Sequence, residues 1–325
     1  MKRNIAVIAG GNSSEREVSL RSANTVLEHL DKEIYNPYLV EIKGKTMCAV
    51  LDGNQYPIDL NDFSFSKDGE KIVFNYAYII IHGTPGENGI LEGYLKLLEI
   101  PHSTCGVLAS SLTFNKFMLN QFLKSFGIRI ADSIMLRKGD VITAADVVEK
   151  IGLPCFIKPS DGGSSFGTTK VKEPEQIEQA IAAAFKESDE IMIESFMQGI
   201  EVTNGYYKTK QREVFLPVTE VVPKRDFFDY EAKYNGAVEE ITPARIPDEL
   251  RDRIQKLTAA IYNIVGCSGI IRNDYIITSG NKINLLEINT IPGMTETSFI
   301  PQQIRAAGMT VKDVLTEIIE NSFNQ

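Results

Sequence analysis

The sequence predicts an α/β protein whose first third contains a parallel sheet and whose later parts are α+β. Two observations predict the parallel sheet. A strand of buried type at 4–9 passes through a glycine turn at 10–12 into an amphipathic helix, and the apolar run at 78–81 passes through a glycine-rich loop into a helix at 90–99. Strands that alternate with helices in this way usually lie parallel, and ligands bind beyond their carboxyl ends.

The 325 residues are enough for two or three domains of roughly 100–200 residues each. We expect three, at 1–103, 104–195 and 196–325. The expected elements of the second domain are a helix at 115–126 ended by Gly127, a helix at 174–186, and antiparallel strands near 154–158, 168–171 and 190–194. Those of the third are strands near 201–208 and 213–222, a helix at 247–265, a hairpin at 270–289 and a helix at 311–323.

Composition and charge exclude several classes of protein. The net charge of −9 argues against a general nucleic-acid-binding protein. No run approaches the ~18 apolar residues of a membrane span, and the first residues lack the pattern of an export signal, so we expect a cytoplasmic protein. The four cysteines are far apart and the three histidines form no cluster with zinc spacing, so we expect reduced cysteines and no zinc chemistry.

The most informative segment is the predicted hairpin, with a tight turn at 279–282. A turn centred between Gly280 and Asn281 places Asp274 opposite Glu287 and Arg272 opposite Asn289. Because side chains alternate along a strand, these four polar groups share one face. Two facing carboxylates repel, so a cation should offset the cost.

The cation of the hairpin is either Arg272 itself or a divalent ion such as Mg²⁺, which prefers oxygen ligands. The alternative is a surface hairpin with solvated charges. An odd-length turn or a bulge would change the register and weaken the interpretation.

Two lysines are candidates for binding phosphate. Lys158 ends an apolar strand and opens a loop of glycines and serines at 159–167, in which amide groups can converge on an anion. The loop matches no Walker sequence, and its alternative is a flexible surface turn. Lys116 lies in the first turn of a helix, where a cation is unfavourable unless a phosphate binds beside it; its alternative is a plain surface lysine.

Three further features are weaker. Residues Ser14 and Glu17 predict a capping box, which would place Glu15 in the first turn of a helix, as a ligand or simply as a favourable charge. His82 follows an apolar strand and should point into the ligand crevice, unless it is a hydrogen-bonded loop histidine. The aromatic and charged segment at 225–239 predicts an active-site lid, or else an exposed connection.

Six segments in this order resemble the D-alanine–D-alanine ligases of the ATP-grasp superfamily, over essentially the whole chain. They are 10–19, 82–89, 158–165, 229–234, 272–274 and 287–295. The resemblance implies an ATP-grasp fold with an N-terminal Rossmann-like, parallel-sheet domain. Residues 1–103 would bind substrate, 104–195 would be the central ATP-grasp domain, and 196–325 the C-terminal ATP-grasp domain with a lid at 225–239.

The resemblance also implies a reaction and a role for each candidate residue. Two D-alanines would be joined at the expense of ATP through an acyl phosphate, releasing ADP and phosphate, for peptidoglycan precursor synthesis. Asp274, Glu287 and Asn289 would bind two Mg²⁺ ions, with Mn²⁺ as an alternative; Lys116, Lys158 and Lys233 would hold phosphates; Glu194, Ser195 and Met197 would form the adenine hinge, and Glu201 would bind ribose. Glu15, in a network with Ser164 and Tyr234, would hold the first ammonium; His82 and Arg272 would lie by the reacting carboxylate, and Gly293 and Ser298 in the second D-alanine site.

Some positions depart from the family pattern, including Ser195, where lysine is common, and Asn88, where aspartate is frequent. They affect adenine packing more than the core chemistry. A D-alanine–D-lactate ligase is the nearest alternative, and Tyr234 argues against it. A non-catalytic ATP-binding regulator is another, and the intact hairpin cluster argues against decay. The resemblance implies a homodimer whose partners are small molecules, D-alanine and ATP, with neither nucleic acid nor membrane.

Overall fold

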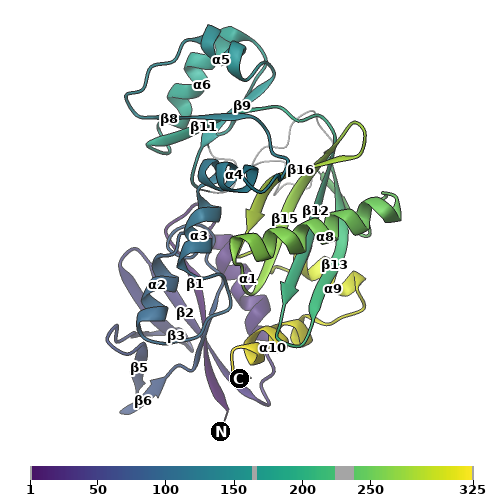
Figure 1. Ribbon diagram of the computed structural model, residues 1–325. Helices are drawn as coiled ribbons and strands as arrows, with labels where there is room; N and C mark the ends of the chain where they lie inside the picture. Colours follow the sequence, from purple (N-terminus) through teal and green to yellow (C-terminus); the bar gives the residue numbers. More distant parts are fainter. Residues whose placement is uncertain (1, 163–166, 224–237, 324–325) are drawn as a thin grey trace.

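The computed structural model describes residues 2–162, 167–223 and 238–323 (Figure 1). Expectations for 163–166 and 224–237 lie outside the described residues. The described chain forms an N-terminal unit at the lower left of Figure 1, a small unit at the top and a C-terminal unit at the right. Two short helices that follow the N-terminal unit, α3 (Val107–Phe114) and α4 (Lys116–Lys124), lie between the units.

The N-terminal unit contains a five-stranded sheet in the order β4-β3-β2-β1-β7. At its centre, β1 (Arg3–Gly10) pairs in parallel with β2 (Tyr35–Lys43) and with β7 (Tyr76–Ile79). The predicted parallel sheet is thus confirmed at the centre, while its edge is antiparallel. The remaining elements are β3 (Thr46–Leu51), β4 (Asn54–Pro57), the hairpin of β5 (Ser64–Lys67) and β6 (Glu70–Val73), α1 (Arg16–His29) and α2 (Ile90–Leu97).

The small unit is a four-stranded antiparallel sheet, β10-β9-β11-β8, as the α+β pattern predicted. Its elements are β8 (Ser133–Arg137), α5 (Ala144–Lys150), β9 (Cys155–Pro159), β10 (Thr169–Val171), the short helices η1 (Pro174–Gln176) and α6 (Ile177–Ala184), and β11 (Glu190–Ser195). Strand β8 was not expected. Gly127 adopts a φ of +77° beyond α4, and the amide of Ile128 closes the helix end on the carbonyl of Leu123.

The C-terminal unit has a five-stranded antiparallel sheet, β14-β13-β12-β15-β16. Its elements are β12 (Ile200–Lys208), β13 (Glu213–Pro223), β14 (Val238–Ile241), α8 (Asp248–Val265), β15 (Ile270–Thr278), β16 (Lys282–Asn289), α9 (Phe299–Ala306) and α10 (Val311–Asn321). The last helix, α10, packs on the N-terminal unit. Its residues Val314 and Leu315 are fully buried in the same apolar cluster as Val7 and Val26 of that unit.

The register of the hairpin agrees with the prediction, for a reason that the sequence did not reveal. Its loop has three residues, because Thr278 pairs with Lys282. A bulge then inserts Leu286 between Glu287 and Leu285, which restores the predicted pairs Asp274 with Glu287 and Arg272 with Asn289. Each of these two departures alone would have changed the register by one residue, and together they cancel.

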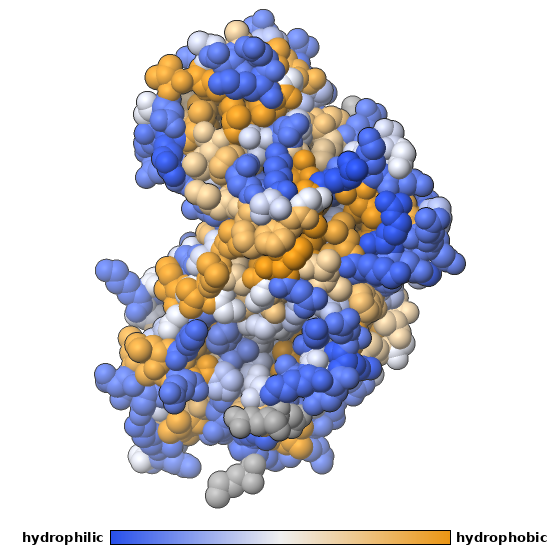
Figure 2. Space-filling view, viewed as in Figure 1, coloured by the Kyte–Doolittle hydropathy of each residue, from blue (hydrophilic) through white to orange (hydrophobic). Residues whose placement is uncertain are grey.

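Side chains on the face shown in Figure 2 are unevenly distributed. Hydrophilic residues cover the outer surface of the top unit and of α8, and a band of apolar residues crosses the middle of the view. Some apolar residues of this region are exposed. Leu108, in α3, is 78% exposed, and Phe126, just beyond α4, is 53% exposed. Within the described residues, no helix combines the length and the apolar character that a membrane span requires.

Candidate active site

A cavity of about 770 Å³ opens where the three units meet, and its lining comes from all of them. The N-terminal unit contributes Glu15 and His82, which follow the carboxyl ends of β1 and β7. This is the position that the parallel sheet predicted for a ligand site. The other predicted site residues along its wall are Lys116, Lys158, Glu194, Ser195, Met197, Glu201, Arg272, Asp274, Glu287, Asn289, Gly293 and Ser298. Ser164, Lys233 and Tyr234 lie outside the described residues.

The hairpin cluster is centred on Asp274, whose side chain is 10% exposed. Arg272 donates from Nε to Oδ1 and from Nη2 to Oδ2 of this carboxylate, both at 2.8 Å. The amide nitrogen of Asn289 donates to Oδ2 at 3.2 Å, and Glu287 lies 4.0 Å from Arg272. Burial acts to lower the pKa of Arg272, but the charges of Asp274, Glu287 and Glu87 outweigh it, so the pKa is raised and the guanidinium remains charged.

The same cluster has the donor set that a hard cation requires. Asn289 uses its amide nitrogen toward Asp274, which leaves its carbonyl oxygen available beside the two carboxylates. Three oxygen donors on one face of a hairpin fit Mg²⁺. Among the described residues, no group of three or more histidine, cysteine, aspartate or glutamate side chains is arranged to hold a metal, so a cation here depends on the asparagine.

Lys116 and Lys158 line the cavity at the end of β9, and they have different partners. Lys158 donates to Glu194 across the β9–β11 pair, where the two side chains are 12% and 6% exposed. The backbone amide of Lys116 donates to the carbonyl of Ser160 at 2.7 Å, and its Nζ donates to the carbonyl of Gly162. Helix α4 is capped by Asn115, whose side chain accepts from the amide of Met118. Lys116 therefore contacts the predicted phosphate loop, whereas Lys158, which precedes that loop in the chain, is paired with Glu194.

His82 is buried, and its Nε2 has no hydrogen-bond partner among the described residues. Burial lowers the pKa of this imidazole, while the nearby charge of Glu15 acts in the opposite direction. An unpartnered buried nitrogen is costly in a protein. Its position on the cavity wall indicates that the missing partner is a bound molecule.

Glu15 begins helix α1, but the predicted capping box does not form. Glu15 itself is the N-cap residue and the helix starts at Arg16, without a side-chain cap bond. The hydroxyl that bonds the amide of Glu15, at 3.2 Å, belongs to Ser13, which also donates to the carbonyl of His82. Ser13 therefore ties the two predicted substrate residues, Glu15 and His82, together.

Gly293 and Ser298 lie side by side in the loop before α9. A Cβ at Gly293 would approach the hydroxyl of Ser298 to 2.9 Å, so a larger residue would make that hydroxyl rotate away. The hydroxyl of Ser298 lies 2.7 Å from that of Thr295, and the amide of Met294 donates to Ser22 of α1. The loop is thereby fixed to the N-terminal unit.

Glu87 also lines this cavity, although no pattern in the sequence predicted a role for it. One of its carboxylate oxygens accepts from the amide of Gly83 at 2.7 Å. Burial, together with the charges of Glu15 and Glu287, raises the pKa of Glu87 to about 8. The only signal in the sequence was its place in the 82–89 segment, because its partner charges come from elements far away along the chain.

Comparison with known proteins identifies the family. A family model described as D-ala D-ala ligase N-terminus matches residues 4–105, and one described as D-ala D-ala ligase C-terminus matches 122–320. The D-alanine–D-alanine ligase of Bacteroides fragilis is 62% identical over 324 residues, which are 99% of this chain and the whole of that relative.

The chain belongs to the D-alanine–D-alanine ligase family.

Solved structures of this family share its fold. D-alanyl-alanine synthetase A from Vibrio cholerae superposes with a TM-score of 0.90 at 26% identity, covering 100% of this chain and 99% of the other. The D-alanine–D-alanine ligase from Bacillus anthracis, solved in complex with ATP, gives a TM-score of 0.79 at 27% identity over 99% and 97% of the two chains. The predicted ATP-grasp fold is therefore confirmed.

Proposed function

We propose that this chain joins two D-alanines into D-alanyl-D-alanine, with ATP as the energy source and ADP and phosphate as products, for peptidoglycan precursor synthesis. The observation that carries this proposal is the convergence in one cavity of an oxygen-ligand cluster, two lysines and a substrate wall. These come from three different units of the chain. The family membership supports the same reaction.

The proposed role of each site residue follows from the charge of its side chain. We propose that Glu15 binds the ammonium group of the first D-alanine, and that Arg272 and His82 lie beside its carboxylate. A carboxylate does not react with an amine at neutral pH, so it must first take the γ-phosphate of ATP and become an acyl phosphate. Lys116, which contacts the loop at Gly162, and Lys158, which lines the same cavity, would spread the charge on the moving group.

We propose that the second D-alanine binds beside Gly293 with its carboxylate at Ser298, in the loop that the Met294 amide ties to α1. Attack of its amine on the acyl phosphate forms a tetrahedral oxyanion and expels phosphate. Arg272 is already oriented by two hydrogen bonds to Asp274, so it can stabilise that oxyanion without rearrangement.

Asp274, Glu287 and Asn289 would hold Mg²⁺, which supplies charge neutralisation of the ATP phosphates when bound. Two ions, and replacement by Mn²⁺, remain parts of this proposal. Glu194, Ser195 and Met197 would contact adenine, and Glu201 the ribose. The proposed roles of Ser164, Lys233 and Tyr234, and of a lid at 225–239, concern residues largely outside the described ones; Val238 and Glu239 of that segment begin β14.

We also propose the three-domain division at 1–103, 104–195 and 196–325, a homodimer, and a cytoplasmic location. Light scattering at several protein concentrations tests the dimer. Its failure would leave the proposed reaction untouched, because the described cavity is lined within one chain.

The decisive experiment measures ADP release with D-alanine, L-alanine and D-lactate offered separately, each with ATP and Mg²⁺. We expect release with D-alanine alone and formation of the dipeptide. Formation of a depsipeptide in a further reaction that contains both D-alanine and D-lactate would identify the D-alanine–D-lactate activity instead. ATP binding without D-alanine-dependent release would identify a non-catalytic protein.

A further inference from the structure

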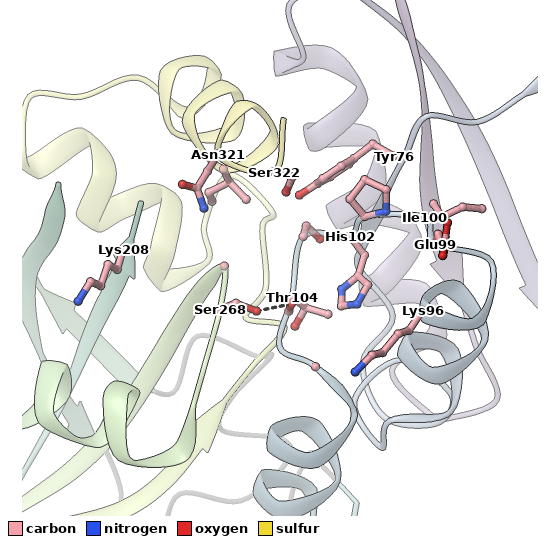
Figure 3. Close-up of a pocket in the computed structure, with 15 residues that line it drawn as sticks. Tyr76, Lys96, Glu99, Ile100, His102, Thr104, Lys208, Ser268, Asn321 and Ser322 are labelled. Carbon is pink, nitrogen blue, oxygen red and sulfur yellow. Dashed lines mark hydrogen bonds between the residues drawn. The ribbon is translucent and has the colours of Figure 1, made fainter. Parts of the chain in front are cut away.

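A second cavity, of about 430 Å³, lies between the N-terminal and C-terminal units (Figure 3). Two strands connect it with the catalytic cavity. Strand β7 begins with Tyr76 at the second cavity and is followed by His82 at the catalytic cavity. Strand β12 likewise has Lys208 at the second cavity and Glu201 at the catalytic cavity. At about 3.3 Å per residue, the two cavities are roughly 20 Å apart.

Two side chains of this cavity each carry one buried polar atom without a hydrogen-bond partner of good geometry among the described residues. Tyr76 is completely buried, and its hydroxyl, which points toward Ser322 in Figure 3, makes no hydrogen bond of good geometry with a described residue. The buried Nδ1 of His102 likewise has none. Polar atoms buried in this way are rare in folded proteins, so each calls for a ligand or an ordered water. Burial lowers the pKa of His102, which makes the imidazole neutral and able to accept or donate one hydrogen bond.

The charges around the cavity favour an anion. Lys96 forms no ion pair within the described part of the chain, whereas Lys208 is paired with Glu213 at 3.0 Å. Glu99 is the one carboxylate among the lining residues. Gly106, also on the wall, is the N-cap of α3, and the first turn of that helix carries no acidic residue. The first amides of a helix and its dipole attract negative charge.

Gly106 also leaves room for a ligand. A Cβ built on this residue meets no atom within 4 Å, and its φ of −77° suits any amino acid. Glycine is therefore not required here by the backbone, and the space beside it is open. A side chain placed at this position would occupy that space next to the amides of α3.

We propose that this cavity is a second binding site, separate from the catalytic cavity, for a small molecule that carries one phosphate or carboxylate group. The anionic group binds Lys96 and the first amides of α3, and the rest of the molecule meets the Tyr76 hydroxyl and the His102 imidazole. Because the walls come from both the N-terminal and the C-terminal units, an occupant contacts both at once.

Calorimetric titration with inorganic phosphate and, separately, with acetate tests this site. The full-length protein is first saturated with Mg²⁺ and a non-hydrolysable ATP analogue, so that the catalytic cavity is filled. We expect one saturable site for at least one of the two anions; phosphate alone or acetate alone tells which group the site prefers. Absence of saturable binding by both overturns the proposal.

Two variants locate the binding, and a third is the matched control. Lys96→Gln should weaken it roughly tenfold, the value of one charged hydrogen bond. Gly106→Asp should abolish it, because the new carboxylate takes the place of the anion, and the variant should stay folded since aspartate is a good N-cap. Lys186→Gln, which changes an exposed lysine of the top unit, should leave it unchanged.

Binding that survives Lys96→Gln or Gly106→Asp at full strength contradicts the proposal, provided that thermal melts show both variants folded. Loss of binding in Lys158→Gln would place the anion in the catalytic cavity and contradict it equally.

Discussion

The β15–β16 hairpin and helix α2 each bury a carboxylate, and they do so in opposite ways. Asp274 as a whole residue is 7% exposed, and both of its carboxylate oxygens accept from Arg272. Glu92 is completely buried, and neither of its oxygens has a hydrogen-bond partner of good geometry among the described residues. Burial raises the pKa of Glu92 to about 7.

The difference shows what a buried acid needs in order to serve a reaction. A carboxylate with a guanidinium and an amide beside it can keep negative charge in a nearly closed cavity, where that charge can bind a cation. A carboxylate without such partners retains its proton up to a higher pH and reduces the stability of the fold when it loses that proton. The first arrangement lies on the cavity wall, and the second lies away from it.

Replacing Glu287 tests the first arrangement, and we expect the largest effect. Glu287→Gln keeps the shape of the side chain but removes the charge opposite Asp274, so cation binding should fail. Turnover should fall about 1000-fold or more, which corresponds to roughly 4 kcal/mol in the activation barrier. ADP release at saturating Mg²⁺ measures it, with an unchanged circular dichroism spectrum as evidence of folding. Glu149→Gln, on an exposed face of α5, is the control; a Glu287→Gln enzyme of near wild-type rate would refute the metal assignment.

Glu92→Gln tests the second arrangement through pH dependence. The pKa of Glu92 is about 7 in the folded protein against an ordinary 4.5, so its contribution to stability is complete below pH 4.5 and is lost as the pH rises toward 7. The variant should match the wild type near pH 4.5 and be more stable at pH 8, by up to about 3 kcal/mol. Urea unfolding at the two pH values measures this difference. An advantage that is equal at both would show that Glu92 is not the titrating group.

Glu15→Gln tests a charge that should act on one substrate only. The KM for the first D-alanine should rise about tenfold or more, since one charged hydrogen bond is worth roughly 1.5–3 kcal/mol. The KM for ATP should change little, because ATP carries no ammonium group. Steady-state kinetics with each substrate varied in turn gives both values. Equal increases for the two substrates would make Glu15 a structural charge at the start of α1.

Ser195→Ala should have the smallest effect. The hydroxyl of Ser195 accepts from the amide of Asp132 at 3.1 Å, which fixes the end of β11 beside the segment before β8. Its loss should lower the free energy of unfolding by about 0.5–1.5 kcal/mol. Turnover at saturating ATP should stay within a factor of two, as measured by ADP release. A much larger loss of turnover would mean that this hydroxyl contacts the nucleotide.

The sequence predicted the fold and the site best where local patterns determine them. The alternation of side chains along the hairpin predicted that Asp274 faces Glu287, and the glycines beyond β1 and β7 predicted a ligand crevice beside Glu15 and His82. That all four residues share one cavity was implied only by the family resemblance. The predicted capping box does not form because Ser13, rather than Ser14, donates its hydroxyl to the carbonyl of His82, which lies 69 residues away along the chain.

Other features could not be predicted because distant segments create them. The raised pKa of Glu87 results from its burial and from the charges of Glu15 and Glu287, which come from different units. The short helix α3 has weak periodicity of its own, and strand β8 is determined by its pairing with β11, more than 50 residues later in the chain. The bulge at Leu286 leaves no mark that distinguishes it from an ordinary strand residue, although it restores the register of the whole cluster.

The last helix of the chain also has a consequence for biosynthesis. Helix α10 packs on α1, Glu320 binds Arg3 and Tyr35, and Lys312 binds Asp31. A ribosome makes the first sheet hundreds of residues before this helix, and the nascent N-terminal unit therefore waits with part of its apolar surface uncovered. Only after residues 311–321 have left the exit tunnel can they close that surface. The N-terminal unit therefore completes its folding long after its own residues have been made.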